Sequence, residues 1–144
     1  MAVREIRDEV LPAVRVLTKE QRVRVSRLPV VLDALFTLLE AEAEVMGLRS
    51  EGGGFVRYLG KVNEVEDGPV QACLPVSGDG GHVMPELRAI AIDGAGEDAR
   101  YPGVLALYDQ LSAHMETTGL TAEGPPRETY AAGRITVAWA VRPA

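Results

Sequence analysis

The chain has 144 residues, 47% of them hydrophobic and 25% charged, which is the balance of one soluble domain of ordinary size. Its formal net charge of −6 at pH 7 repels phosphate backbones and therefore disfavours direct binding of nucleic acid. The single cysteine, Cys73, excludes an intramolecular disulfide and favours a reducing compartment, so we expect a cytoplasmic protein.

The N-terminal segment and the most apolar segment both argue against secretion and membrane insertion. The first ten residues contain charges where a signal peptide needs an apolar run. Residues 28–39 are the most apolar, but Asp33 interrupts them and the run is too short to span a bilayer. We therefore expect no interaction with a membrane.

Strand and helix patterns follow one another in the first third of the chain. Valines alternate with arginines over 14–16 and 22–27, which predicts a hairpin or one long bent strand with one buried face. From Pro29 to Met46 apolar residues recur at helical spacing, and Gly47 follows. Proline at a helix start and glycine just past its end predict a helix of about 18 residues here.

Two short apolar runs come next. Residues 55–59 and 70–76 are separated by a polar break, and they predict two antiparallel strands. The glycine-rich segment 77–81 predicts a connector. The chain before this connector is therefore expected to form one strand, one helix and two further strands, in that order.

The same order of elements then begins again. Residues 87–92 predict a strand and residues 102–118 a helix, for which Gly119 is the expected cap. Residues 127–130 and 135–141 predict two further strands. The second half of the chain thus has the same predicted order of elements as the first.

A constant offset of 72 residues relates the two halves and indicates an internal duplication. It is shared by glycines, tyrosines and helix core positions: Gly47 with Gly119, Gly52 with Gly124, Tyr58 with Tyr130, Leu35 with Leu107 and Leu39 with Leu111. We expect one domain over residues 1–144, with repeat one at about 1–76 and repeat two at about 82–144.

The expected fold class is α+β. Two strand–helix–strand–strand repeats with pseudo-twofold symmetry are predicted to form an antiparallel sheet with both helices on one side. A groove between the two repeats is the natural place for a small molecule, since neither repeat fills it alone.

Several stretches resemble a known family, and most of them lie in the second half: Tyr108-Asp109-Gln110-Leu111, Thr118-Gly119-Leu120, Gly124-Pro125-Pro126-Arg127-Glu128-Thr129-Tyr130 and Thr136-Val137-Ala138-Trp139-Ala140-Val141. With them the chain resembles the gyrase-inhibitor-like (GyrI-like) effector-binding family over nearly its whole length. The first half matches more loosely. The most specific element is the Gly-Pro-Pro-Arg-Glu-x-Tyr stretch.

The resemblance implies a domain that binds lipophilic, often cationic or aromatic compounds, usually behind a DNA-binding helix-turn-helix in multidrug-responsive regulators. Because the two repeats use all 144 residues, we expect a stand-alone member. Such members sequester compounds or hydrolyse reactive cyclopropane-bearing DNA alkylators, an activity suited to antibiotic resistance. The family's usual tryptophan in the second helix is His114 here, so the resemblance does not define the exact shape of the ligand.

The resemblance implies that Glu128 is the binding glutamate of the ligand cleft. Strand alternation places Glu128 and Tyr130 on one face, with Arg127 and Thr129 on the other. Val56 occupies the position of Glu128 in repeat one, so a single charged anchor is expected.

Further candidates for the pocket are aromatic or titratable residues on predicted strands or beside the second helix: Phe55, Tyr58, Tyr101, His114 and Trp139. A phenol has a polar tip to satisfy, which favours the pocket for the tyrosines. Plain core packing stays open for Phe55 and Trp139, and a partly exposed helix position stays open for His114. Tyr108 and Phe36 lie at helix core positions and are expected to pack.

No metal and no cofactor are expected. His82 and His114 are too scattered for a metal site, since no other histidine or cysteine stands at ligand spacing. The glycine-rich segments lack the Gly-Lys-Ser/Thr ending that binds phosphates. Neither Gly-x-Ser-x-Gly nor a Cys-His arrangement indicates a covalent nucleophile.

The leading functional hypothesis is a protein that binds a lipophilic aromatic or cationic small molecule between its repeats, with Glu128 as charge partner. The alternative is a hydrolase for a cyclopropane-type compound, in which Glu128 activates water as general base and Tyr130 assists the leaving oxygen. A third hypothesis, a subunit that docks on a protein such as a regulator or gyrase, stays open.

Overall fold

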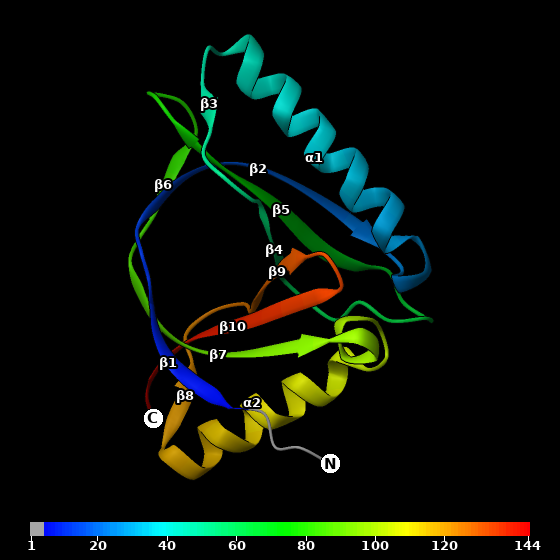
Figure 1. Ribbon diagram of the computed structural model, residues 1–144, viewed down its shortest axis with the longest axis vertical. Helices are drawn as coiled ribbons and strands as arrows, with labels where there is room; N and C mark the ends of the chain where they lie inside the picture. The colour runs from blue at the N-terminus through cyan, green and yellow to red at the C-terminus, as the bar shows by residue number, and fades with distance from the viewer. Residues whose placement is uncertain (1–4) are drawn as a thin grey trace. The chain divides into compact units, whose positions relative to one another are not determined.

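The computed structural model describes residues 5–144 and has an α+β fold, as predicted (Figure 1). Helix α1 (Leu28–Val45) and helix α2 (Val104–Thr118) each pack on antiparallel strands. The described chain divides into two compact units. We call Pro12–Glu86 the first-repeat unit, and residues 5–11 together with Leu87–Ala144 the second-repeat unit.

The sheet of the first-repeat unit is antiparallel, with the strand order β4-β5-β2-β6. Its strands are β2 (Val14–Val23), β3 (Arg49–Ser50), β4 (Phe55–Tyr58), β5 (Gly68–Ser77) and β6 (His82–Met84). β3 pairs with β5 beside this path. The predicted hairpin or long strand is one strand as far as Val23, and a 3₁₀ turn, η1 (Val25–Arg27), then leads into α1.

The sheet of the second-repeat unit has the order β1-β7-β10-β9, also antiparallel. Its strands are β1 (Ile6–Leu11), β7 (Leu87–Ala95), β8 (Leu120–Ala122), β9 (Arg127–Ala131) and β10 (Arg134–Pro143). β8 pairs with β10, and a 3₁₀ turn, η2 (Gly96–Ala99), precedes α2. The strands and helix predicted from 87 to 141 therefore all form.

The strands at the borders of the repeats pair differently from the expected division at residues 76 and 82. β1 lies along β7, with Ile6 opposite Ile92 and Leu11 opposite Leu87. β6 lies along β2, with Val14 opposite Met84. Backbone hydrogen bonds thus place β1 in the second-repeat unit and β6 in the first.

Each helix covers one face of its own sheet, with α1 along β2 and β5 and α2 along β7 and β10 (Figure 1). Leu35 and Leu39 of α1, and Leu107 and Leu111 of α2, are buried in two separate cores. These are the helix pairs that the 72-residue offset predicts. The offset ends after the third strand of each repeat, because the connection 59–67 is longer than the turn at 132–133.

Glycine ends both helices as predicted. Gly47 follows α1 with φ 71° and Gly119 caps α2 with φ 70°, a left-handed conformation that other residues adopt only with strain.

Cys73 is buried. No helix formed by residues 5–144 is long and apolar enough to cross a membrane.

Candidate functional site

A carboxylate lies inside the second-repeat unit. Glu128 stands on β9, opposite Val137 of β10, and is only 6% exposed. Across residues 5–144 the buried polar or charged side chains are just Gln71 and Glu128. Because burial of a carboxylate is costly without hydrogen bonds, its partners decide what this group can do.

Two phenols donate hydrogen bonds to this carboxylate. The Tyr130 Oη donates to Glu128 Oε1 and the Tyr108 Oη donates to Glu128 Oε2, both at 2.5 Å. Tyr130 is two residues further along β9 and reaches the same side, as strand alternation predicts. Tyr108 comes from α2, so helix and sheet both hold the carboxylate.

The indole of Trp139 completes the group. Its ring meets the ring of Tyr108 edge to face, with centroids 5.9 Å apart and planes at 77°. Its Nε1 donates to the carbonyl of Gly124 at 2.9 Å, in the loop that leads into β9. We call Glu128, Tyr108, Tyr130 and Trp139 the Glu128 cluster.

The local sequence explains why α2 contributes a phenol. Tyr108 follows buried Val104 by four residues and precedes buried Leu111 by three, so helical periodicity turns it toward the sheet. The sequence predicted packing at this position, and its ring does pack against the core of this unit. The additional role of its hydroxyl was missed, although Tyr108 opens one of the stretches that carry the family resemblance.

The chemistry of the Glu128 cluster suits a positively charged or electrophilic ligand. An ionised carboxylate only accepts hydrogen bonds, and two O–H donors offset part of its cost of burial. Aromatic ring faces attract cations within about 6 Å. Tyr130 is 43% exposed, so the cluster extends to the protein surface.

Two other predicted residues of this unit are Tyr101 and His114. Tyr101 is partly buried and packs on the same hydrophobic core as Tyr108. His114 lies six residues after Tyr108 on α2, and at 100° per residue its side chain is turned about 120° away around the helix axis. His114 is partly exposed, as the alternative interpretation expects.

The remaining predicted residues, Phe55 and Tyr58, belong to the first-repeat unit, where they face opposite sides of β4. Tyr58 packs with Val70 on the side covered by α1, whereas Phe55 is buried with Cys73 on the other side. The structure therefore does not bring these two rings together. Their contact with a ligand stays a prediction.

The first repeat has no carboxylate at the position of Glu128. Val56 stands there, 0% exposed, in the core beneath α1. Phe36, at the repeat position of Tyr108, packs on the same core. The first repeat therefore has apolar Val56 and Phe36 where the second has Glu128 and Tyr108, whereas both repeats have a tyrosine at the position of Tyr130.

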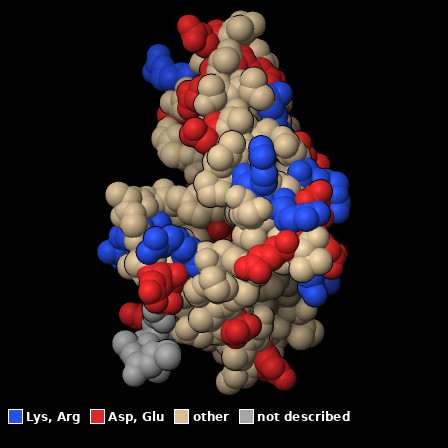
Figure 2. Space-filling view, turned by 90° about the vertical axis from the view of Figure 1, so that its right-hand side faces the viewer, with Lys and Arg blue, Asp and Glu red and all other residues tan. Residues whose placement is uncertain are grey.

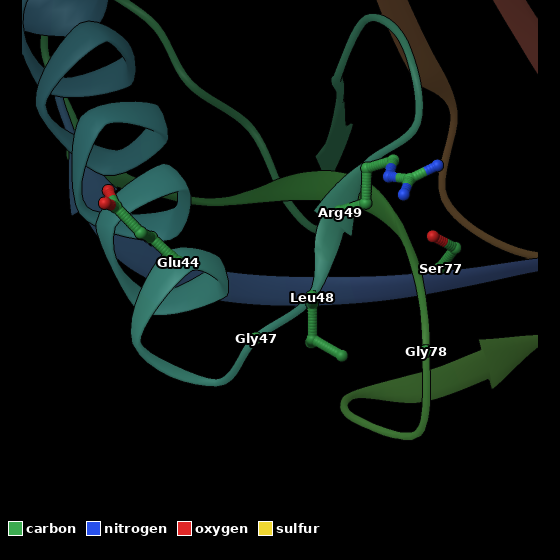
Figure 3. A pocket seen from close by; sticks show the side chains of 6 residues that line it. All are labelled: Glu44, Gly47, Leu48, Arg49, Ser77 and Gly78. Carbon is green, nitrogen blue, oxygen red and sulfur yellow. The ribbon is translucent and has the colours of Figure 1, made fainter.

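A surface depression of about 570 Å³ lies in the first-repeat unit at the end of α1 (Figure 3). Glu44 stands on one rim, and Arg49 and Ser77 stand on the other, with Leu48 between them (Figure 3). Glu44 lies at the end of α1 and Arg49 and Ser77 are paired strand residues of β3 and β5, and the polar side chains that line the depression are all exposed. The Glu128 cluster is therefore the stronger candidate site.

Among residues 5–144 no group of three or more metal-ligating side chains comes together.

No family model and no curated protein matches this sequence. Solved structures do. The EcmrR C-terminal domain is 16% identical with a TM-score of 0.83, covering 99% of this chain and 100% of that one. In an EcmrR–DNA complex, the EcmrR chain is 19% identical with a TM-score of 0.75 and covers 98% of this chain. The match spans 58% of that longer chain.

Two further solved structures are similar over almost their whole length. A hydrolase from Listeria innocua is 10% identical with a TM-score of 0.63, covering 96% of this chain and 92% of its own. SAV2435 bound to tetraphenylphosphonium is 12% identical with a TM-score of 0.56, covering 96% and 94%. These similarities fit a GyrI-like fold. At such low identity they show the fold alone.

Proposed function

We propose that this protein binds a lipophilic, aromatic or cationic small molecule at the Glu128 cluster, as an effector-binding or sequestering protein. The observation that carries the proposal is a buried carboxylate whose two oxygens each accept a hydrogen bond from a phenol. Trp139 adds a second aromatic ring, in edge-to-face contact with Tyr108.

The fold itself does not require this carboxylate. Val56 fills the same repeat position, fully buried, in a sheet of the same construction. An apolar side chain there avoids the desolvation cost that Glu128 incurs. A costly group at a position where valine suffices is typical of a functional site.

A cationic ligand would complement the cluster in two ways. The carboxylate attracts the positive charge more strongly inside the protein than in water, because the effective dielectric constant is lower. The aromatic rings add cation–π attraction of about 0.5–2 kcal/mol. The GyrI-like fold of SAV2435, which is bound to tetraphenylphosphonium, supports a ligand of this kind.

Isothermal titration calorimetry tests the proposal with two probes that share three phenyl rings. Methyltriphenylphosphonium carries a positive charge and triphenylphosphine oxide is neutral. We expect the cation to bind with roughly micromolar affinity, about 8 kcal/mol, and about tenfold more tightly than the neutral compound. Equal affinity for the two probes in the wild-type protein would contradict the charged-anchor role of Glu128.

A hydrolase is the second candidate, because a general base and two acids already lie within hydrogen-bond distance. Glu128 takes a proton from water, and the hydroxide attacks a carbon of an electrophilic cyclopropane. The ring C–C bond breaks, its electron pair moves to a conjugated oxygen, and Tyr130 protonates that oxygen. Glu128 then returns its proton to the Tyr130 oxygen along their hydrogen bond, so that only water is consumed.

The likeness to a structure named a hydrolase supports this second candidate at the level of the fold. A spirocyclopropyl cyclohexadienone is a suitable probe, since its ring opens to an alcohol that chromatography resolves. The wild-type protein is expected to form this alcohol faster than heat-unfolded protein does. Equal rates would leave the binding function as the sole proposal.

A further inference from the structure

Helix α1 exposes a second apolar face that its own unit leaves uncovered. Val30 is 65% exposed, Leu38 54% and Val45 88%, and the exposed Ala34 and Ala41 lie between them. Steps of three and four residues place all five on one side of the helix. We call these five residues the α1 stripe.

The α1 stripe is separate from the face that packs on the sheet. The buried face is formed by Val31, Leu35, Leu39 and Ala43. At 100° per residue, the centres of the two faces lie about 120° apart around the axis. Packing within the unit therefore does not explain why the stripe is apolar.

Helix α2 provides an internal comparison, since the 72-residue offset gives four of the five stripe positions a counterpart in it. The two alanines correspond to alanines, but Leu38 corresponds to Gln110 and Val45 corresponds to Thr117, both polar. The large apolar side chain that α2 does expose is Leu105, which is 46% exposed. The stripe is thus a property of the first repeat and not a requirement of the fold.

The order of residues in the α1 stripe is symmetric. Read along the helix it is valine, alanine, leucine, alanine, valine, with Leu38 in the middle. In a two-fold symmetric contact, residue i of one copy meets residue j of the other, and j meets i. An antiparallel pair of α1 helices would place Val30 against the partner's Val45 and Leu38 against the partner's Leu38.

Charges near α1 favour the same antiparallel arrangement. Arg27 and Arg24 are exposed where the helix begins, Arg24 in an ion pair with Asp67, whereas Glu40 and Glu44 are exposed in the C-terminal half of the helix. Figure 2 looks onto the side of the molecule that carries α1 in Figure 1, and both red and blue side chains lie along this side. Antiparallel pairing brings each basic end toward an acidic end and opposes the helix dipoles.

We propose that a second copy of this chain covers the α1 stripe, with the two α1 helices antiparallel across a two-fold axis at Leu38. The alanines on either side of Leu38 allow close approach of the helices. A helix of 18 residues is about 27 Å long, so the contact is smaller than a standard interface of roughly 1,200–2,000 Å². The dimer is therefore expected to dissociate in the micromolar range, and it does not depend on the ligand site.

Sedimentation velocity of the full chain at increasing concentration tests the proposal. The mass is expected to rise from 15.5 kDa toward twice that value. Leu38→Glu is expected to weaken the dimer at least roughly a hundredfold, because it places two carboxylates on the axis. Leu105→Glu on α2 is the matched control and leaves the dimer intact. A wild-type chain that stays monomeric at about 1 mM overturns the proposal.

Cysteine crosslinking tests the orientation without relying on the Leu38→Glu chain. Cys73 is buried, so an introduced surface cysteine reacts selectively. Val30→Cys and Val45→Cys chains, mixed and oxidised, are expected to form the mixed disulfide. Preferential crosslinking of Val30→Cys to itself would indicate a parallel pair and overturn the proposed axis.

Discussion

The Tyr108 hydroxyl on α2 donates a 2.5 Å hydrogen bond to the buried Glu128 carboxylate on β9. This bond joins the candidate site to the packing of the helix on its sheet. A change in the position of α2 would therefore change the surroundings of Glu128, and loss of the bond is expected to affect both stability and binding.

Tyr108→Phe tests this coupling, because it removes the hydroxyl and keeps the ring against Trp139. Loss of a hydrogen bond to a buried charged group is expected to lower the free energy of unfolding by about 1–3 kcal/mol. Urea denaturation measures the change. Tyr101→Phe removes a hydroxyl from a ring on the same core and serves as control. Equal effects of the two substitutions would contradict a special role for Tyr108.

The pH dependence of stability is expected to involve Asp93 on β7. The Arg7 guanidinium donates two hydrogen bonds to its carboxylate, at 2.9 and 3.2 Å, and Thr136 donates one at 2.6 Å. These bonds, that from Arg7 most of all, hold the pKa of Asp93 below its usual 3.8. The carboxyl group of Asp93 thus binds a proton less readily in the folded protein than in the unfolded chain. The interactions of the Asp93 carboxylate therefore stabilise the folded protein above pH 3.8, and this stabilisation is lost as the pH falls through the lowered pKa.

Asp93→Asn is expected to lower the free energy of unfolding at pH 7 by less than about 1 kcal/mol, because Arg7 and Asp93 are both partly exposed. The difference from wild type is expected to shrink as the pH falls through the lowered pKa of Asp93, because the wild-type carboxylate then also becomes protonated. Denaturation at several pH values measures it, with exposed Asp109→Asn as control. A difference that stays constant with pH would argue against the ion pair.

Truncation of two adjacent leucines on α1 is expected to change the free energy of unfolding by very different amounts. Leu39 is 0% exposed and Leu38 is 54% exposed. Leu39→Ala is expected to cost about 2–5 kcal/mol through the cavity that it leaves. Leu38→Ala is expected to stay within about 0.5 kcal/mol in dilute monomeric protein. Similar thermal shifts for the two variants would mean that the helix face is assigned incorrectly.

The sequence predicted the elements with strong periodicity and clear ends. α1 and α2 have apolar residues at helical spacing and glycine caps, and both form as expected. β1 was not predicted, because Ile6–Leu11 carries charges at three of its positions and lacks clear alternation. Its pairing with β7 is a contact between segments far apart in the chain, which local patterns do not encode.

The same difference between local patterns and contacts of distant segments applies to the Glu128 cluster, of which the sequence predicted only one part. Glu128 and Tyr130 lie on one strand, so alternation alone places them on one face. The contact of Tyr108 depends on how α2 packs against the sheet, and the sequence showed only that this position faces inward. Phe55 and Tyr58 are three residues apart in one strand and therefore lie on opposite faces of it, and whether either ring contacts a ligand stays a prediction.

Glu128→Gln separates a binding protein from an enzyme, because the amide keeps the shape of the side chain but takes no proton from water. In a binding protein it is expected to weaken methyltriphenylphosphonium about tenfold, with no turnover to lose. In a hydrolase it is expected to lower turnover of the spirocyclopropyl cyclohexadienone by about 10²–10⁴, while affinity for triphenylphosphine oxide stays within a few fold. Calorimetry and chromatography on the same samples measure both, with exposed Glu116→Gln as control. If Glu128→Gln behaves like this control in both assays, Glu128 takes no part in ligand recognition or catalysis.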